Sequence, residues 1–348
     1  AAAAAAAAGG EAENEQDGEE GGGAHACDSI TRAPAAGAGP PEDAHRRADR
    51  TLRRLPQHLV TGAELDAAAL ARLLDRAQAL KADPLSSRAL AGRSVALVFE
   101  QPSTRTRVSF EAGIAELGGH ALVLRPDEMQ LTRGESVRDT ALVLSRHVAA
   151  IGLRTGSDER IEELARHAGV PVVNMLSPRH HPCQALADLL TMREAFGPDL
   201  SGRVLAYVGD GNNVARSLAL VGALAGVEVR VAAPAGLQLE AGLGAYLTDD
   251  PDEAVAGADV VYTDVWVSMS DHPGEAQQRR ERLAPYRLDA ALLDRAASHA
   301  FALHCLPAHP GEEIAEDVLY GERQRIWDQA ENRRHAQKAL LEQLVSHG

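Results

Sequence analysis

Apolar and polar positions follow regular periods along most of the chain. The apolar residues between Leu65 and Leu74 recur at helical spacing, which predicts an amphipathic helix over residues 62–82. Short apolar runs beyond it predict strands at 94–99, 120–124, 149–153, 170–174, 203–209, 227–233, 259–264 and 301–305. Segments of helical period separate most of these runs. This alternation predicts an α/β fold with two domains, each a parallel sheet flanked by helices.

One connection between predicted strands is unusually short. Only residues 234–244 separate the strand at 227–233 from a strand-like run at 245–248. This length is close to the lower limit for a parallel crossover, which normally contains a helix. We therefore expect at most a weak helix in this segment.

Residues 1–50 lack the periodic pattern. They contain poly-alanine, an acidic cluster and a Gly/Pro-rich stretch, with ten acidic and four basic residues in total. Such a segment buries too little apolar surface to offset the entropy lost on ordering. It is predicted to be a disordered acidic tail.

Composition narrows the possible functions. The 348 residues suffice for two domains, and the net charge of -15 with no long basic run argues against nucleic acid as a partner. Three widely spaced cysteines form neither a disulfide framework nor a CxxC metal motif. No apolar run approaches the roughly 18 residues of a membrane span, and no secretory or mitochondrial leader is evident. A cytoplasmic protein that does not bind membranes is expected.

The first predicted strand leads into a motif suited to an anion. After the strand that ends at Phe99 come Ser103, Thr104, Arg105 and Thr106, followed by a helical pattern. Free N–H groups at a helix N-terminus, hydroxyls and a guanidinium together suit a phosphate group. From the residues alone, an ordinary N-cap beside surface arginines explains the motif equally well.

Several motifs, in order, resemble those of the aspartate/ornithine carbamoyltransferase family, and of its ornithine-specific branch in particular. They are FEQPSTRTRVSFEAGIAELGG (99–119), HHPCQALADLLT (180–191), YVGDGNNVARSL (207–218), DVWVSMS (264–270), HCLPAHPGEE (304–313) and QAENRRHAQKALL (329–341). The resemblance covers roughly residues 53–345. It implies a carbamoyl-phosphate domain at 51–184, an ornithine domain at 185–329, and a C-terminal helix at 330–348 that packs back onto the first domain.

The resemblance assigns residues to carbamoyl phosphate. The residues that would bind it are Ser103, Thr104, Arg105, Thr106, Gln130, Arg154, His181, Gln184, Cys305, Leu306 and Arg333. In the related aspartate enzyme, the loop equivalent to that of Gln130 comes from a neighbouring subunit. His181, Arg154 and Thr106 would stabilise the negative charge that develops on the carbamoyl oxygen.

The same resemblance assigns residues to the amine acceptor. Asp264 and Cys305 would orient the amine, while Asn213, Ser268 and Met269 would hold the amino-acid end of ornithine. The implied catalytic set is Arg105, Arg154, His181, Asp264 and Cys305. The Leu306–Pro307 bond is a candidate for the cis form.

The implied reaction is transfer of the carbamoyl group of carbamoyl phosphate to the δ-amine of L-ornithine, which gives L-citrulline and phosphate. No cofactor and no metal are required, and a homotrimer or a multiple of trimers is expected. His304 and His309 have no evident third ligand in the sequence, which argues against zinc. The turn at Gly209–Asn213 matches a dinucleotide fingerprint only incompletely, which argues against NAD.

Three residues depart from the family pattern. Gln101 replaces a frequent lysine, Thr132 replaces a glycine, and Ser270 replaces the glycine of the ornithine loop. Relatives also have a longer helix where this chain has residues 234–244. Two alternatives therefore stay open: a carbamoyltransferase for another amine such as putrescine, and a non-catalytic paralogue that binds carbamoyl phosphate.

Overall fold

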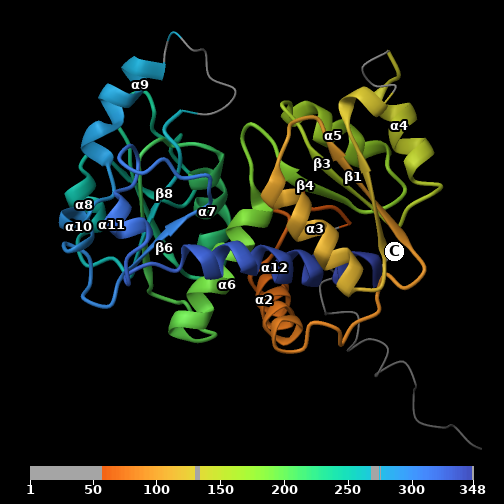
Figure 1. Ribbon diagram of the computed structural model, residues 1–348, viewed down its shortest axis with the longest axis horizontal. Helices are drawn as coiled ribbons and strands as arrows, with labels where there is room; N and C mark the ends of the chain where they lie inside the picture. Colours follow the sequence, from red (N-terminus) through yellow and green to blue (C-terminus); the bar gives the residue numbers. More distant parts are fainter. Residues whose placement is uncertain (1–56, 130–133, 268–273, 275, 347–348) are drawn as a thin grey trace, which may run out of the picture. The chain divides into compact units, whose positions relative to one another are not determined.

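A computed structural model describes residues 57–129, 134–267, 274 and 276–346 (Figure 1). The predicted tail at 1–50 lies outside these residues. So do Gln130, Thr132, Ser268, Met269 and Ser270. No helix in the described part of the chain is long and apolar enough to cross a membrane.

The first sheet has four parallel strands in the order β2-β1-β3-β4. Its strands are β1 (Ser94–Phe99), β2 (His120–Leu124), β3 (Ala150–Arg154) and β4 (Val172–Leu176). Its helices are α2 (Ala67–Ala82), α3 (Thr104–Glu116), α4 (Val137–Leu144) and α5 (Asp158–His167), with a 3-10 turn η2 (Pro126–Glu128) after β2. The central strand β1 is buried along nearly its whole length, as expected for a parallel strand covered on both faces.

The second sheet has five parallel strands in the order β7-β6-β5-β8-β9. They are β5 (Val204–Val208), β6 (Glu228–Ala232), β7 (Tyr246–Thr248), β8 (Val260–Thr263) and β9 (Phe301–His304). The helices from here to the C-terminus are α6 (Pro182–Phe196), α7 (Asn213–Leu224), α8 (Pro251–Val255), α9 (Ala276–Leu283), η4 (Ala284–Tyr286), α10 (Ala290–Leu293), α11 (Glu316–Leu319) and α12 (Ile326–Ser346). The α/β fold with two helix-flanked parallel sheets is confirmed.

The predicted strands are all present, with ends displaced by no more than two residues, but the first helix was predicted too long. It begins at Ala67 rather than at residue 62. The Asp66 carboxylate accepts a hydrogen bond from Ala69 N and caps the helix there. Gly62, with φ of 99°, and the Glu64 carboxylate, which binds its N–H, form a turn before the helix.

The short crossover contains no helix. Residues between β6 and β7 form turns only, and the two strands still pair in parallel, with Arg230 opposite Tyr246. The prediction of at most a weak helix is confirmed. Residues of the crossover lie against the turn that follows β5, where Gly211 N donates to Leu237 O at 2.8 Å. A Cβ at Gly211 would lie only 2.6 Å from that oxygen, so the contact requires glycine.

Two helices connect residues of both sheets. α12 packs against α2, α3, α6 and β9 (Figure 1). One core cluster contains Leu97 of β1, Leu186 of α6 and Leu205 of β5. The N-terminus of α6 and the middle of α12 thereby place side chains near the carboxyl ends of strands from both sheets.

Candidate active site

The predicted anion motif begins α3. Ser103 is the N-cap of this helix, and its hydroxyl accepts a hydrogen bond from Thr106 N at 3.3 Å. Thr106 is buried, whereas Thr104 is exposed and Arg105 is half-buried. A cavity of about 490 Å³ opens beside the motif, with Ser103 and Thr104 in its wall. Ser103 and Thr104 are thus accessible from this cavity, whereas Arg105 and Thr106 do not line it.

Three arginines gather near this motif. Arg154 ends β3, directly opposite Phe99 at the end of β1. Arg333 comes from α12 and donates to Thr106 Oγ1 at 2.7 Å and to Gln184 Oε1 at 2.9 Å. Burial, together with the charges of Arg333 and Arg105, lowers the pKa of Arg154 to about 10. An anion would relieve this repulsion between like charges.

His181 and Gln184 lie at the start of α6. His181 precedes the first residue of the helix, and its backbone N–H donates to Ser217 Oγ at 2.7 Å. Burial and the charges of Arg333 and Arg154 hold the pKa of His181 well below its ordinary value, so the imidazole is neutral near pH 7. It offers an N–H donor without adding a fourth positive charge.

Several buried polar atoms of this cluster have no protein partner. Within the described part of the chain, Arg154 Nε, Arg333 Nε and His181 Nδ1 make no hydrogen bond. Buried polar groups are usually satisfied. These nitrogens are therefore available to a polar ligand at this cluster.

A second cluster lies at the carboxyl ends of β8 and β9. Thr263 and His304 pair across these strands, so the residues that follow them, Asp264 and Cys305, are neighbours. Cys305 Sγ donates to Asp264 Oδ1 at 2.9 Å. Burial and the Asp264 charge raise the pKa of Cys305 well above its ordinary value, so the thiol is protonated. This arrangement suits a cationic or neutral amine.

Hydrogen bonds link the two clusters. Gln184, which accepts from Arg333, donates to Asp188. Gln329 also donates to Asp188 and accepts from the backbone N–H of His304, the residue before Cys305. The structure therefore brings together the predicted residues of both sheets. Gln130, Ser268 and Met269 lie outside the described residues.

Sequence reasoning missed Asn212. Its side-chain amide donates to Asp264 Oδ2 at 2.8 Å, and its oxygen caps α7 by accepting from Val214 N at 2.9 Å. The predicted Asn213 instead donates to Ser177 O at 2.9 Å. An asparagine just before a helix after a strand is a recognisable N-cap signal. Its contact with Asp264 depends on the pairing of β5 with β8, which the local sequence does not specify.

The segment after Cys305 has the predicted special backbone. The Leu306–Pro307 bond is cis, and Leu306 has φ of 60°. His304 fixes this segment, because its Nδ1 accepts from Leu306 N at 2.8 Å while its Nε2 lies 3.2 Å from Glu313 Oε1. The accepting Nδ1 assigns the proton to Nε2.

Two groups of side chains in the described part of the chain could hold a metal ion, and each contains only one of the two histidines His304 and His309. Donor atoms of Asp264, His304 and Cys305 lie within 4.8 Å of one another, as do those of His309, Glu312 and Glu313. However, both ring nitrogens of His304 already have hydrogen-bond partners. A metal at the first of these groups would have to displace them.

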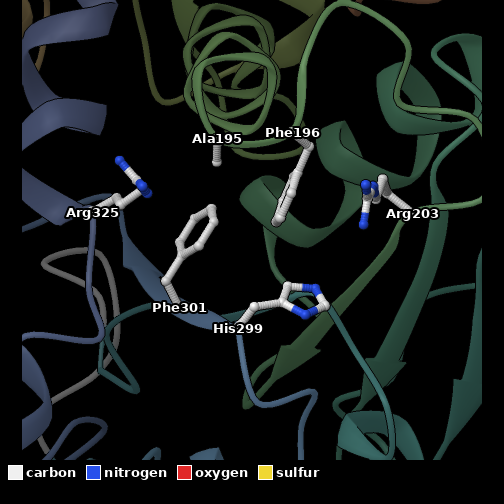
Figure 2. A pocket seen from close by; sticks show the side chains of 6 residues that line it. All are labelled: Ala195, Phe196, Arg203, His299, Phe301 and Arg325. Atoms are coloured by element: carbon white, nitrogen blue, oxygen red, sulfur yellow. The ribbon is translucent and has the colours of Figure 1, made fainter.

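A separate pocket lies at the opposite, amino end of the second sheet (Figure 2). The rings of Phe196 and Phe301 stack there at 5.6 Å between centroids, and the Arg203 guanidinium lies 4.5 Å from the Phe196 ring centroid. Arg203 and His299 both pair with Asp259 at 2.8 Å. None of the predicted site residues line this pocket, in keeping with the preference of ligands for the carboxyl ends of parallel strands.

Comparisons with known proteins match the parts of the chain that contain each of the two sheets. Residues 57–194 match the family model of the aspartate/ornithine carbamoyltransferase carbamoyl-P binding domain, and residues 201–344 match the Asp/Orn binding domain of that family. The ornithine carbamoyltransferase of Acidothermus cellulolyticus is 53% identical over 303 residues, which are 83% of this chain and 96% of that protein. That of Methanoculleus marisnigri is 51% identical over 282 residues, 78% of this chain and 91% of that protein. The crystal structure of ornithine carbamoyltransferase from Thermus thermophilus matches with a TM-score of 0.79 and 44% identity, covering 84% of this chain and 99% of that one.

Proposed function

The chain belongs to the aspartate/ornithine carbamoyltransferase family, and from that premise we propose how its residues divide the reaction between them. The enzyme transfers the carbamoyl group of carbamoyl phosphate to the δ-amine of L-ornithine and releases L-citrulline and phosphate. A C–N bond forms, the C–O bond to phosphate breaks, and the amine loses one proton. We propose that residues 51–184, with 330–348 packed against them, bind carbamoyl phosphate, and that residues 185–329 bind ornithine.

The phosphate group binds at the N-terminus of α3 in this proposal. Ser103, Thr104, Arg105 and Thr106 hold it, and Arg333 and Gln130 complete the pocket. Support comes from the helix N-terminus and from the arginines, whose mutual repulsion an anion relieves. Arg107 is not part of the set, because its guanidinium pairs with Glu111 at 2.6 Å.

The carbamoyl group lies between His181, Arg154 and Thr106. These residues donate hydrogen bonds to the carbonyl oxygen, on which negative charge builds in the tetrahedral transition state. Gln184 binds the carbamoyl amide, and Cys305 and Leu306 approach the same group. The neutral state of His181 and the unpartnered nitrogens of Arg154 and His181 support these roles.

Ornithine presents its δ-amine to Asp264 and Cys305. A free alkyl amine is almost wholly protonated at pH 7, whereas the nucleophile must be neutral. The carboxylate attracts the cation, and together with the protonated thiol it holds the amine after deprotonation. Asn213, Ser268 and Met269 bind the amino-acid end. Orientation and charge stabilisation then supply most of the acceleration.

We also propose a homotrimer or a multiple of trimers, a role in arginine biosynthesis and a cytoplasmic location. The exposed apolar side chains of Val108 on α3 and of Leu142 and Val143 on α4 support a subunit interface on the first lobe, the part of the chain that contains the first sheet. Cys183 and Cys305 are both free thiols, in keeping with a reducing compartment.

The observation that carries the proposal is the thiol–carboxylate pair of Cys305 and Asp264, which a chain of hydrogen bonds links to Arg333. The test is citrulline formation by the purified chain from carbamoyl phosphate and ornithine, with putrescine, lysine and aspartate as parallel acceptors. We expect turnover with ornithine and none with aspartate, which Asp264 would repel. Turnover confined to putrescine or lysine would show that ornithine is not the acceptor. Carbamoyl-phosphate binding without any turnover would favour a non-catalytic role.

A further inference from the structure

Asp188 is a buried carboxylate to which the reaction as described gives no role. It lies on α6, four residues after Gln184, and none of its surface is exposed. Its Oδ1 accepts hydrogen bonds from Gln184 Nε2 at 2.8 Å, from Gln329 Nε2 at 2.7 Å and from Tyr262 Oη at 3.5 Å. Its Oδ2 has no partner in the described part of the chain. An apolar residue would fill this space without the cost of burying a carboxylate.

The first of these contacts fixes the orientation of an amide. Because the Gln184 NH2 group donates to Asp188, its oxygen faces Arg333 and accepts a hydrogen bond at 2.9 Å. The opposite orientation would place the amide oxygen against a carboxylate and the NH2 group against a guanidinium. Both contacts would be repulsive. Asp188 and Arg333 together thus fix the orientation of the Gln184 amide.

The second contact reaches the strands that carry the amine site. Gln329 donates to Asp188 and also to Tyr262 Oη at 2.9 Å, while its oxygen accepts from His304 N at 3.0 Å. His304 immediately precedes Cys305, and Tyr262 lies two residues before Asp264. Burial raises the pKa of Tyr262 well above its ordinary value, so its hydroxyl remains a donor. The ends of β8 and β9 are therefore tied to the same carboxylate.

We propose that Asp188 is a positioning residue for carbamoyl transfer, which orients the Gln184 amide toward the carbamoyl group and, through Gln329, aligns the strand ends that carry Asp264 and Cys305. The inference rests on the proposed function. It adds a link between the two substrate sites that neither substrate contacts.

The test uses full-length Asp188→Asn, assayed for citrulline formation at pH 8, where the wild-type side chain is ionised. The variant keeps the shape but weakens the acceptor and adds a donor with no partner. We expect kcat/KM for carbamoyl phosphate to fall by about 10- to 100-fold, the loss typical of slightly misplaced reacting groups. Thr191→Val is the matched control. It removes another buried hydrogen bond between α6 and α12, made by Asn332, and should stay within about twofold of wild type.

A double-mutant cycle separates positioning from a structural role. If Asp188 acts through Gln184, adding Asp188→Asn to Gln184→Ala should cost much less than it costs in the wild-type background. Fully multiplicative losses would overturn the proposal, as would an Asp188→Asn enzyme with unchanged kcat/KM. Gln329→Met tests the contact between Asp188 and Gln329. It should raise KM for ornithine while leaving the affinity for carbamoyl phosphate unchanged. Equal effects of Gln329→Met on the binding of ornithine and of carbamoyl phosphate would contradict the role given to Gln329. Absence of citrulline with the wild-type protein would instead contradict the proposed function itself.

Discussion

The thiol of Cys305 donates its only proton to Asp264, a carboxylate that Asn212 also binds from the other side. Two donors therefore fix the carboxylate before any substrate arrives. At the scale of single residues, we propose that this preorganisation is how the protein contributes to the amine site, because an oriented acceptor does not need to reorganise during the reaction.

Replacement of the thiol should therefore impair turnover more than stability. We expect Cys305→Ala to lower kcat by about 10- to 100-fold and to raise KM for ornithine, since Asp264 loses one of its two donors. Cys183→Ala is the matched control, because Cys183 is also a buried free thiol but donates to Asn174 O, away from the amine site. Steady-state kinetics with both variants measure the difference. Equal losses in both would remove the assigned role of Cys305.

Burial of Asp188 has a consequence for stability against pH. Burial raises the pKa of Asp188 from 3.8 to about 7, against the opposing hydrogen bonds from Gln184 and Gln329. Between these values the folded state binds more protons at this group than the unfolded state does. The contribution of Asp188 to the free energy of unfolding therefore falls as the pH rises from about 4 to 7, and is constant above.

Denaturant unfolding at pH 5 and pH 8 measures this contribution. The side chain introduced by Asp188→Asn does not titrate between these pH values. The unfolding free energy of the wild type, measured relative to that of Asp188→Asn, should therefore be lower at pH 8 than at pH 5. An unchanged difference would show that Asp188 is ionised at both values.

At the scale of elements, the turn after β5 and the short crossover depend on each other. Gly211→Ala would bring a Cβ to within 2.6 Å of Leu237 O and 2.7 Å of Leu239 N, both backbone atoms that cannot move independently. We expect a lower melting temperature and a higher KM for ornithine, because Asn212 follows directly. The control is Gly169→Ala, where the nearest atom would be 3.7 Å away. A Gly211→Ala enzyme as stable as the control would contradict the close approach.

The attachment of α12 can be tested with the two lysines of the chain. Lys338 is fully buried and donates to Glu116 Oε2 and to Pro84 O, both at 2.6 Å. Lys338→Met should lower the unfolding free energy by about 3 kcal/mol, because it leaves a largely buried carboxylate with fewer partners. Lys81 pairs with Glu194 nearer the surface, and Lys81→Met should cost about 1 kcal/mol or less. Urea unfolding of both variants gives the comparison, and equal costs would contradict this account.

The elements were largely predictable because their signals are local. The strand runs and the absence of a helix in 234–244 are readable within a few neighbouring residues. The Asp66 cap is an equally local signal, but the prediction of a helix from residue 62 overlooked it. The contacts of Asn212 with Asp264 and of Asp188 with Gln329 were not readable in this way, since each joins residues that are far apart in the chain. Arg333 was found only through the resemblance. By itself, an arginine in a helix gives no sign that it will reach Thr106.

At the scale of the whole molecule, the proposed trimer predicts that one exposed apolar surface is a subunit contact. Val108 of α3 is 61% exposed and follows the anion motif closely, whereas Tyr320 at the end of α11 is 62% exposed on the second lobe. If the first lobe forms the subunit contact, Val108→Glu should shift the mass measured by light scattering toward the monomer, because the interface would bury a charge. Tyr320→Glu should leave the mass unchanged. The reverse result would move the interface to the second lobe.

The helix-free crossover also bears on how the chain folds. A parallel pair joined through a helix requires a long loop to close before its strands meet, and that entropic cost grows with loop length. Here Arg230 of β6 and Tyr246 of β7 pair across a few turns. The contact order of this corner is correspondingly low, which favours early formation. The edge of the second sheet, with the turn that carries Asn212 against it, is therefore expected to acquire protection from hydrogen exchange before the strands that carry Asp264 and Cys305.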